Sequence, residues 1–530
     1  MAAIMLPALL LSGLTSCTDW LKEDSPGTTK LEDFFTSGEA CRQVVNGCYT
    51  PLQWEYSSTY YPEWMIGDIA GDDALKGGQN VGDGRDAYDV DNFKVNANNA
   101  IMLDYYRAKY MGITRCNLAL DQVGRYEADD TLTEEEKEQM LGEAYFLRGF
   151  YYFQLVRVFG GVPLIDEVLD SSDRWIQPRA TAEAVYAHIL SDFRNAESRL
   201  PGKNEYAAED AGRATKGAAQ AMLCKVNLYA GNYEDAYTWG KMWVDDQYLT
   251  GVYSLFSDYA DNFTLAGENG SESVFEIQYM DDPTSDYGEG NGFSRGTFTS
   301  ILTRPRMSSL GGNSGWGWNH PTQNLYDEFE AGDPRREMTI GIPDASSINE
   351  VEVNYLGSPY YNIKTSLYEG GSFPALSHPS RGPLNYRLVR ASDVLLLYAE
   401  AALESGRDIA AAKWALEQVR ARARAQAADP AATLPAFPGY LGYSDNTDDL
   451  RRAIRHERRV ELGMEGHRWF DLVRWGIAHE VMDRDSGSYG SRESAEARAE
   501  MASFIKGKHE LFPIPAEEIA LNPMEQNPGY

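Results

Sequence analysis

Apolar residues recur at helical spacing through most of the first 250 residues. Val44, Cys48 and Leu52 follow one another every four residues, which predicts a helix within residues 32–52. Thr133 followed by Glu136 is a capping-box arrangement, so a helix should begin directly after Thr133. The same spacing predicts helices over residues 105–123, 134–159 and 181–200.

Two later segments each contain a pair of helices joined at a glycine. In residues 214–246 the joint is Gly231, and in the segment that begins near residue 386 it is Gly406. Both pairs carry a small residue seven places before the glycine and an alanine five places after it; these are Cys224, Ala236, Ala399 and Ala411. Small residues let paired helices approach closely, as in a tetratricopeptide repeat. A generic helical hairpin is the alternative interpretation.

The pattern changes between residues 251 and 385. Gly, Ser, Asn and aromatic residues dominate there, and only short runs such as residues 273–279 alternate like a strand. Long ordered loops often carry function. We therefore expect a single body over residues 31–530, in which helical regions near 31–250 and 386–480 support a loop-rich, variable, ligand-binding region.

The first 17 residues form an apolar run that is too short to span a membrane, which needs about 20 residues. Thr15 and Ser16 are small and directly precede Cys17, so residues 14–17 have the form of a lipobox, with residues 1–17 as the signal peptide. Lipid attachment to Cys17, the mature N-terminus, is the prediction. An ordinary signal peptide or a buried strand is the alternative, and no Lys or Arg precedes the apolar run.

Charge and composition exclude several classes of protein. The chain has 530 residues, a net charge of −32 and 43% hydrophobic residues, so it can bury a large core. The acidic balance argues against nucleic acid as a partner. Residues 18–30 are polar and acidic, which suits a flexible tether. Cysteines beyond Cys17 lack metal-ligand spacing and are expected to be buried; they are Cys41, Cys48, Cys116 and Cys224.

Several blocks of sequence identify a family. They are YRLVRASDVLLLYAEA at 386–401, RHERRVELGMEGHRWFDLVRWG at 455–476, ELFPIPAEEIALNP at 510–523, QNPGY at 526–530, the segment 144–163 and the tripeptide DPR at 333–335. Together they closely resemble the SusD/RagB family of nutrient-binding outer-membrane lipoproteins. The acidic tether is similar to the export signal that sends some bacterial lipoproteins to the cell surface.

The resemblance implies a fold, a place and a partner. The fold would be mostly α-helical, with four repeat-like helix pairs supporting the variable half. The protein would be anchored in the outer membrane, would face the exterior and would deliver ligand to a SusC-like TonB-dependent transporter. No cofactor and no catalytic residue are implied.

Charged residues in the block 455–476 alternate in sign at helical spacing, for example Glu457, Arg458 and Glu461. Such residues can form ion pairs along and between helices. His467 lies close to Glu465 and Asp471 in sequence, and could belong to an acid–base site; a hydrogen-bonded packing role is more usual for a His in these surroundings. We expect these blocks to stabilise the fold and to carry no chemistry.

Two segments contain the mixture of aromatic and polar residues that binds sugars, with rings for the apolar faces and polar groups for the hydroxyls. The first contains Trp64, Asp68, Asp72, Asp73, Lys76, Arg85, Tyr88 and Asn92, and the second contains Tyr279, Tyr287, Phe293, Trp316, Trp318 and Asn319. Trp316 and Trp318 are the strongest candidates, because two indoles between glycines are costly to expose unless a ligand covers them. Packing of both rings against the helical half is the alternative.

Glycan capture is therefore the leading functional hypothesis. Peptide capture, known in some members of the family, is the nearest rival, and a glycoside hydrolase with two carboxylates at one sugar is a rival from another class. A pure interaction scaffold fits the repeats but not the long aromatic insertion. No HExxH or Walker-type motif is present. Asp281–Asp282 and residues 83–91 lack the EF-hand pattern and are expected to be solvated acidic loops, so no metal is predicted.

Overall fold

The computed structural model describes residues 35–169, 175–285, 294–306, 312–342, 358–485, 487 and 495–530. Its α-helices are α2 (Gly38–Tyr49), α3 (Trp64–Ile69), α4 (Arg85–Asp91), α5 (Ala100–Arg125), α6 (Glu134–Phe159), α7 (Ala182–Glu197), α8 (Lys216–Tyr229), α9 (Tyr233–Trp243), α10 (Thr299–Thr303), α11 (Gln323–Glu328), α12 (Arg335–Thr339), α13 (Ala391–Glu404), α14 (Ile409–Gln426), α15 (Thr447–Leu462), α16 (Arg468–Arg474), α17 (Ala478–Met482), α19 (Ala495–Glu500) and α20 (Ala516–Leu521). Other single turns are η2 (Thr50–Gln53), η4 (Lys203–Glu205), η5 (Ala208–Asp210), η6 (Val244–Tyr248) and η7 (Tyr259–Phe263). The predicted mostly helical fold is confirmed.

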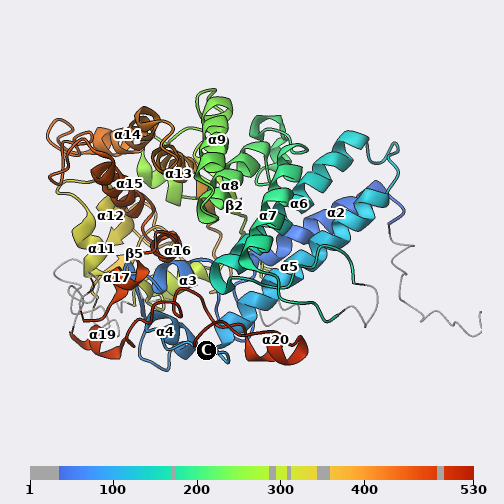
Figure 1. The fold of residues 1–530 in the computed structure, drawn as a ribbon, viewed down its shortest axis with the longest axis horizontal. Coiled ribbons are helices and arrows are strands. Elements are labelled where there is room, and N and C mark those ends of the chain that lie inside the picture. Colours follow the sequence, from blue (N-terminus) through green and yellow to red (C-terminus); the bar gives the residue numbers. More distant parts are fainter. Residues whose placement is uncertain are drawn as a thin grey trace, which may run out of the picture.

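One row of helices (Figure 1) runs from α2 and α5 through α6, α7 and α8 to α9, and includes the two longest, α5 and α6. The predicted start of α6 is correct. The Thr133 hydroxyl accepts a bond from the Glu136 backbone, and the Glu136 carboxylate accepts one from the Thr133 backbone. This reciprocal cap satisfies two amide groups that the first turn of a helix otherwise leaves unpaired.

The two hairpins expected from the glycine joints are α8–α9 and α13–α14. They meet where α9 packs against α13. Cys224, Ala236 and Ala399 are fully buried, and a Cβ placed on Gly240 of α9 would lie 2.9 Å from the Tyr398 ring. Small side chains thus permit the close contact between the two hairpins. This is the physical property expected of a helical repeat.

Strands are few and short. β1 (Ala74–Gly77) pairs with β3 (Trp318–Pro321), β2 (Ser273–Ile277) with β6 (Tyr386–Arg390), and β4 (Ile340–Gly341) with β5 (Tyr361–Asn362), all antiparallel. The first two pairs join segments that are far apart in sequence, whereas β4 and β5 lie about 20 residues apart. The β2–β6 pair lies directly before α13 and connects the loop-rich segment to the helical one.

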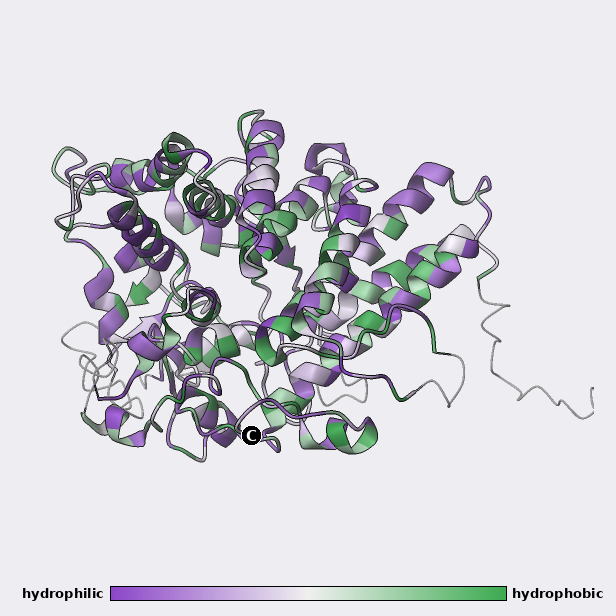
Figure 2. Ribbon diagram, in the orientation of Figure 1, coloured by the Kyte–Doolittle hydropathy of each residue, from purple (hydrophilic) through white to green (hydrophobic). Residues whose placement is uncertain are grey.

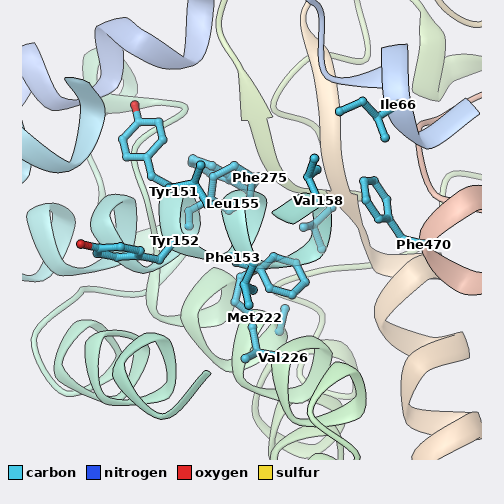
Figure 3. Close-up of a cluster of buried hydrophobic side chains, with 14 of the residues drawn as sticks. Ile66, Tyr151, Tyr152, Phe153, Leu155, Val158, Met222, Val226, Phe275 and Phe470 are labelled. Atoms are coloured by element: carbon cyan, nitrogen blue, oxygen red, sulfur yellow. The ribbon is translucent and has the colours of Figure 1, made fainter. Parts of the chain in front are cut away.

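A single large apolar core extends through both parts of the chain. Figure 3 shows α6 at its centre, with Phe153 directed toward Met222 and Val226 of α8. Phe275 of β2 and Phe470 of α16 contribute to the same cluster. All four cysteines of the described residues are buried and free, as predicted; these are Cys41, Cys48, Cys116 and Cys224. No helix in the described ranges is both long and apolar enough to cross a bilayer.

A second core region is polar. Figure 2 shows α15 as a mainly hydrophilic helix, yet every residue from 456 to 462 is buried. Arg390 of β6 contacts Glu272, Glu461 and Glu465, with shortest N–O distances of 2.6, 3.1 and 2.8 Å. Arg335 of α12 contacts Glu461 from another side. The charge pattern of residues 455–476 therefore forms ion pairs between elements, as the sequence indicates.

Burial and neighbouring charges both shift the pKa values of groups in this polar core region. Burial alone would raise the pKa of Asp471, but Arg458 and Arg474 hold that pKa down at about 2. His467 is buried, and its burial lowers the pKa to about 3, so the imidazole is neutral near pH 7. Its Nδ1 has no hydrogen-bond partner among the described residues.

Candidate ligand-binding site

The β1–β3 pair brings together the two segments that the sequence indicates as ligand-binding. Gly77 is opposite Trp318 and Ala74 is opposite Pro321 in the antiparallel register. The left-handed backbone of Gly77, with φ of 70°, accommodates this approach, because a Cβ there would lie 2.3 Å from the Gly317 carbonyl oxygen. Residues separated by about 240 positions thus share one site.

Five aromatic side chains form one group at this site, which we call the aromatic cluster: Tyr56, Tyr60, Phe298, Trp316 and Trp318. The ring of Tyr60 is central to it. Its centroid lies 4.8 Å from that of Tyr56, 5.1 Å from Phe298, 5.4 Å from Trp316 and 5.9 Å from Trp318. Phe298 and Trp318 are buried, whereas Tyr56, Tyr60 and Trp316 are partly exposed. Burial raises the pKa of Tyr60 to about 12, so its hydroxyl stays protonated near pH 7.

Trp318 forms the inner wall of the aromatic cluster. The Lys76 ammonium lies 4.3 Å from its ring centroid, and the indole Nε1 donates to Asp83 at 3.4 Å. Gly84 packs so closely on the ring that a Cβ would lie 2.3 Å from the indole Cη2. Burial lowers the pKa of Lys76 to about 8. The ring is therefore fixed between a cation and a glycine.

Glu55 holds the two sides of the aromatic cluster together. Its carboxylate is buried and accepts bonds from the Thr297 hydroxyl at 2.7 Å, the Phe298 amide at 2.6 Å and the Thr299 hydroxyl at 2.7 Å. Burial raises the pKa of Glu55, against these bonds. Because Tyr56 follows Glu55 directly, the carboxylate positions the Tyr56 loop against the segment that carries Phe298.

The structure places several predicted residues in the interior. Trp64 is fully buried, and its indole donates to Thr299. Asp72 and Asp73 are also fully buried: Asp72 pairs with Arg468 at 2.6 Å, and Asp73 is 2.7 Å from Arg459. In this structure their carboxylates hold β1 against the block 455–476 and do not reach a surface ligand.

Asn319 and Asp68 form another internal contact. The Asn319 amide donates to Asp68 at 2.9 Å, and the Gly466 amide donates to the other Asp68 oxygen at 2.7 Å. Burial raises the pKa of Asp68 to about 7. Asn319 directly follows Trp318 in β3. Its bond to the buried Asp68 therefore holds the start of this strand from the interior of the protein.

Helix α4 separates the remaining predicted residues of the first segment. Arg85 is exposed at its start and pairs with Asp89 at 3.0 Å. Tyr88 is buried on its other face, where its hydroxyl donates to Glu500 at 2.6 Å. Asp91 is buried and accepts the Lys76 backbone amide. The expectation of a solvated acidic loop over residues 83–91 is therefore wrong, because most of it is helical.

Other predicted residues have different outcomes. Asn92 and Tyr279 are buried, with Tyr279 donating to Glu55. Cys17, Tyr287 and Phe293 lie outside the described residues. Trp318 begins a strand and packs into the core, as the alternative interpretation of the two indoles proposes, whereas Trp316 keeps part of its surface open.

Sequence reasoning missed Tyr56, Tyr60 and Phe298. The signal for the first two is the aromatic density of residues 54–64, where five aromatic residues alternate with polar ones in a segment without helical periodicity. Phe298 has no local signal, since only its contact with Tyr60 distinguishes it. Within the described ranges, no group of His, Cys, Asp and Glu side chains is arranged to hold a metal ion.

Exposed rings on a rigid frame, with polar side chains beside them, define the class of small-molecule binding proteins. Two family models match the chain and together span more than half of it. One is described as the SusD family and matches residues 374–530; the other is described as starch-binding associating with outer membrane and matches residues 19–228. The chain belongs to the SusD/RagB family.

Individual relatives match almost the whole chain. SusD-like protein P2 of Formosa agariphila is 26% identical over 537 residues, which covers 98% of each chain. Among solved structures, a laminarin-binding SusD-like protein is 28% identical, with 93% of this chain and 99% of that chain covered and a TM-score of 0.74. Surface glycan-binding protein A of Bacteroides thetaiotaomicron, in complex with laminarihexaose, is 24% identical, with 93% and 100% covered and a TM-score of 0.77.

Proposed function

We propose that this protein captures oligosaccharides at the aromatic cluster. The observation that carries the proposal is the group of three partly exposed rings, Tyr56, Tyr60 and Trp316, supported by buried rings and by Glu55. Aromatic rings on a fixed support stack on the apolar faces of sugars with little loss of entropy. The names of the relatives, which include binding of laminarin and starch, support the same ligand class.

The charges around the aromatic cluster favour a neutral ligand and binding without catalysis. A glycoside hydrolase needs two carboxylates at one sugar. Asp72 and Asp73 are instead committed to buried pairs with Arg468 and Arg459. Asp83, beside the cluster, accepts from the indole of Trp318 and from the Gln79 amide. We therefore propose a binding protein and not an enzyme.

We propose further that the ligand passes to a SusC-like TonB-dependent transporter in the bacterial outer membrane. Lipid on Cys17 would anchor the chain there, and residues 18–30 would serve as the tether on the exterior face. Family membership and the description of the second family model support the location. Replacement of Cys17 by Ala should release the protein from membranes and abolish fatty-acid labelling.

Calorimetric titration tests the ligand class. The chain from residue 18 onward, which contains every described residue, is titrated with a panel of neutral glycans and peptides, with product analysis of each mixture. Trp316→Ala should weaken glycan binding by about 1–3 kcal/mol, since it removes an exposed stacking surface. Trp175→Ala is the matched control, because Trp175 is 66% exposed and lies outside the aromatic cluster.

Three results would contradict the proposal. Unchanged affinity in Trp316→Ala would remove this ring from the site. Peptide binding without any glycan signal would favour the peptide-capturing alternative. Turnover of a glycan would show that the protein is an enzyme.

A further inference from the structure

A second hollow surface, made of residues outside the aromatic cluster, lies on both sides of the loop that joins α7 to α8. Hollows of about 280 and 210 Å³ flank residues 210–213 of this loop. The larger is bounded by Tyr49 and Gln53, the smaller by Tyr206 and Asn269, and Glu276 contributes to both. We call this surface the loop groove. The larger hollow is close to the lower end of the usual range for small-ligand sites.

Two tyrosine rings on the walls of the loop groove are held from inside the protein. The Tyr49 hydroxyl donates to Glu143 at 2.8 Å and accepts from the Ala214 amide at 3.0 Å. The Tyr206 hydroxyl donates to the Ala214 carbonyl at 2.7 Å. Both hydroxyls are thereby used, and what each tyrosine offers to the hollow is its ring. Rings that are already ordered lose little entropy when a ligand stacks on them.

The polar side chains of the loop groove suit a neutral ligand rich in hydroxyl groups. Arg213 neutralises Asp210 at 2.6 Å and also pairs with Glu143. The amides of Asn269 and Gln278 bond to each other in both directions, at 2.8 and 3.0 Å. Amide groups can both donate to and accept from a hydroxyl. The walls therefore combine ring surfaces with side-chain amides.

The loop groove ends close to the aromatic cluster. Gln53, at one end of the groove, donates to the Gln278 carbonyl at 2.7 Å, and Tyr56 of the cluster follows Gln53 by three residues. Three residues span at most about 10 Å. Tyr279, next to Gln278, donates to Glu55, which holds the Tyr56 loop. The two surfaces are therefore neighbours on a shared frame.

We propose that the loop groove is a second oligosaccharide subsite, which binds the continuation of a neutral glycan chain whose other part stacks on the aromatic cluster. This inference rests on the proposed function. A chain held at one site is present at the other at a high effective concentration, so two modest contacts give stronger binding to long chains. Short oligosaccharides bind at the aromatic cluster alone.

The test compares chain lengths. Laminaritriose and laminarin polysaccharide are titrated into the chain from residue 18 onward and into Tyr206→Ala, Gln53→Ala, Trp316→Ala and the control Tyr206→Phe, which keeps the ring. Tyr206→Ala should weaken polysaccharide binding about tenfold and leave laminaritriose binding unchanged. Trp316→Ala should weaken both, and Tyr206→Phe neither. In hydrogen exchange, residues 206–213 should be protected by the polysaccharide and not by the trisaccharide.

The outcomes separate the two ideas. Unchanged polysaccharide binding in both Tyr206→Ala and Gln53→Ala overturns the second subsite while leaving the proposed function standing. Equal weakening for both chain lengths also overturns it. If the unmodified chain binds no glycan at all in the full panel, the proposed function fails and this inference fails with it. Gln53→Ala keeps the test decisive should Tyr206→Ala not fold.

Discussion

The core around α15 and the surface around Tyr60 are built from opposite kinds of side chain. In the core, Arg390 and Arg335 are buried in ion pairs with Glu461. At the surface, the rings of Tyr56, Tyr60 and Trp316 remain partly open to solvent. Buried ion pairs define a unique geometry but depend on every partner, whereas stacked rings tolerate the arrival and departure of a ligand. The core fixes the fold, and the rings form the proposed binding surface.

Breaking the core should have the largest effect. Arg390→Met leaves Glu272, Glu461 and Glu465 buried without their shared cation, so the free energy of unfolding should fall by about 3–5 kcal/mol. Urea or thermal unfolding followed by circular dichroism measures this. Arg85→Met is the control, because the Arg85 side chain is 62% exposed in its pair with Asp89 and should contribute less than about 1 kcal/mol. Similar small effects in both variants would contradict the assigned role of the core.

Glu55→Gln tests the contact that joins frame and rings. One carboxylate oxygen becomes an amide donor that faces other donors, so stability should fall by about 1–3 kcal/mol. Glycan affinity should fall as well, because the Tyr56 loop loses its support. If unfolding is unchanged while binding is lost, Glu55 contacts the ligand and is not a positioning residue. Calorimetry and unfolding of one preparation distinguish these cases.

The raised pKa of Asp68 makes the free energy of unfolding depend on pH. The direction is opposite to that expected for an acid held in ion pairs, such as Asp471. Burial raises the pKa of Asp68 to about 7, above the unfolded value near 3.9, so the folded chain binds the extra proton between these values and stability falls as pH rises through this window. From pH 6 to pH 8 the Asp68 contribution should amount to about 1 kcal/mol. Asp68→Asn should remove this slope in unfolding experiments. An unchanged slope would show that another group titrates.

The smallest effect is expected at the hydroxyl of the central ring. Tyr60→Phe keeps every ring contact of the aromatic cluster, so the free energy of unfolding should change by less than about 0.5 kcal/mol. Tyr60→Ala, the matched larger change, should lower both stability and glycan affinity. Equal glycan affinity in all three proteins would place the ligand elsewhere.

Local signals in the sequence predicted the helices well. The capping box of α6 and the glycine joints of the two hairpins depend on neighbours within a few residues. The candidate site depends on distant ones. Asp72 and Asp73 have the composition of a ligand site, but their partners Arg468 and Arg459 lie 396 and 386 residues away along the chain. Sequence spacing does not show such pairing, so composition alone predicts a surface site for these two acids, whereas both lie in the core.

Local sequence also fails to show which aromatic residues are buried and which remain partly exposed. Trp316 and Trp318 are two positions apart between glycines, and local sequence does not distinguish them. Strand β3 begins at Trp318 and pairs with β1, which turns this ring inward over Lys76. The sequence does not indicate Tyr60 as a site residue, because its central place in the aromatic cluster depends on four rings that surround it in space.

The pairing of Asp73 with Arg459 also bears on the order in which the chain can acquire its shape. During synthesis, Asp72 and Asp73 are made nearly 400 residues before Arg459 and Arg468, so the two carboxylates remain without these cations while the intervening chain is added. Contacts of such long sequence separation form late and slowly. The first helices can pair early, but the proposed binding surface forms only when the protein is almost complete.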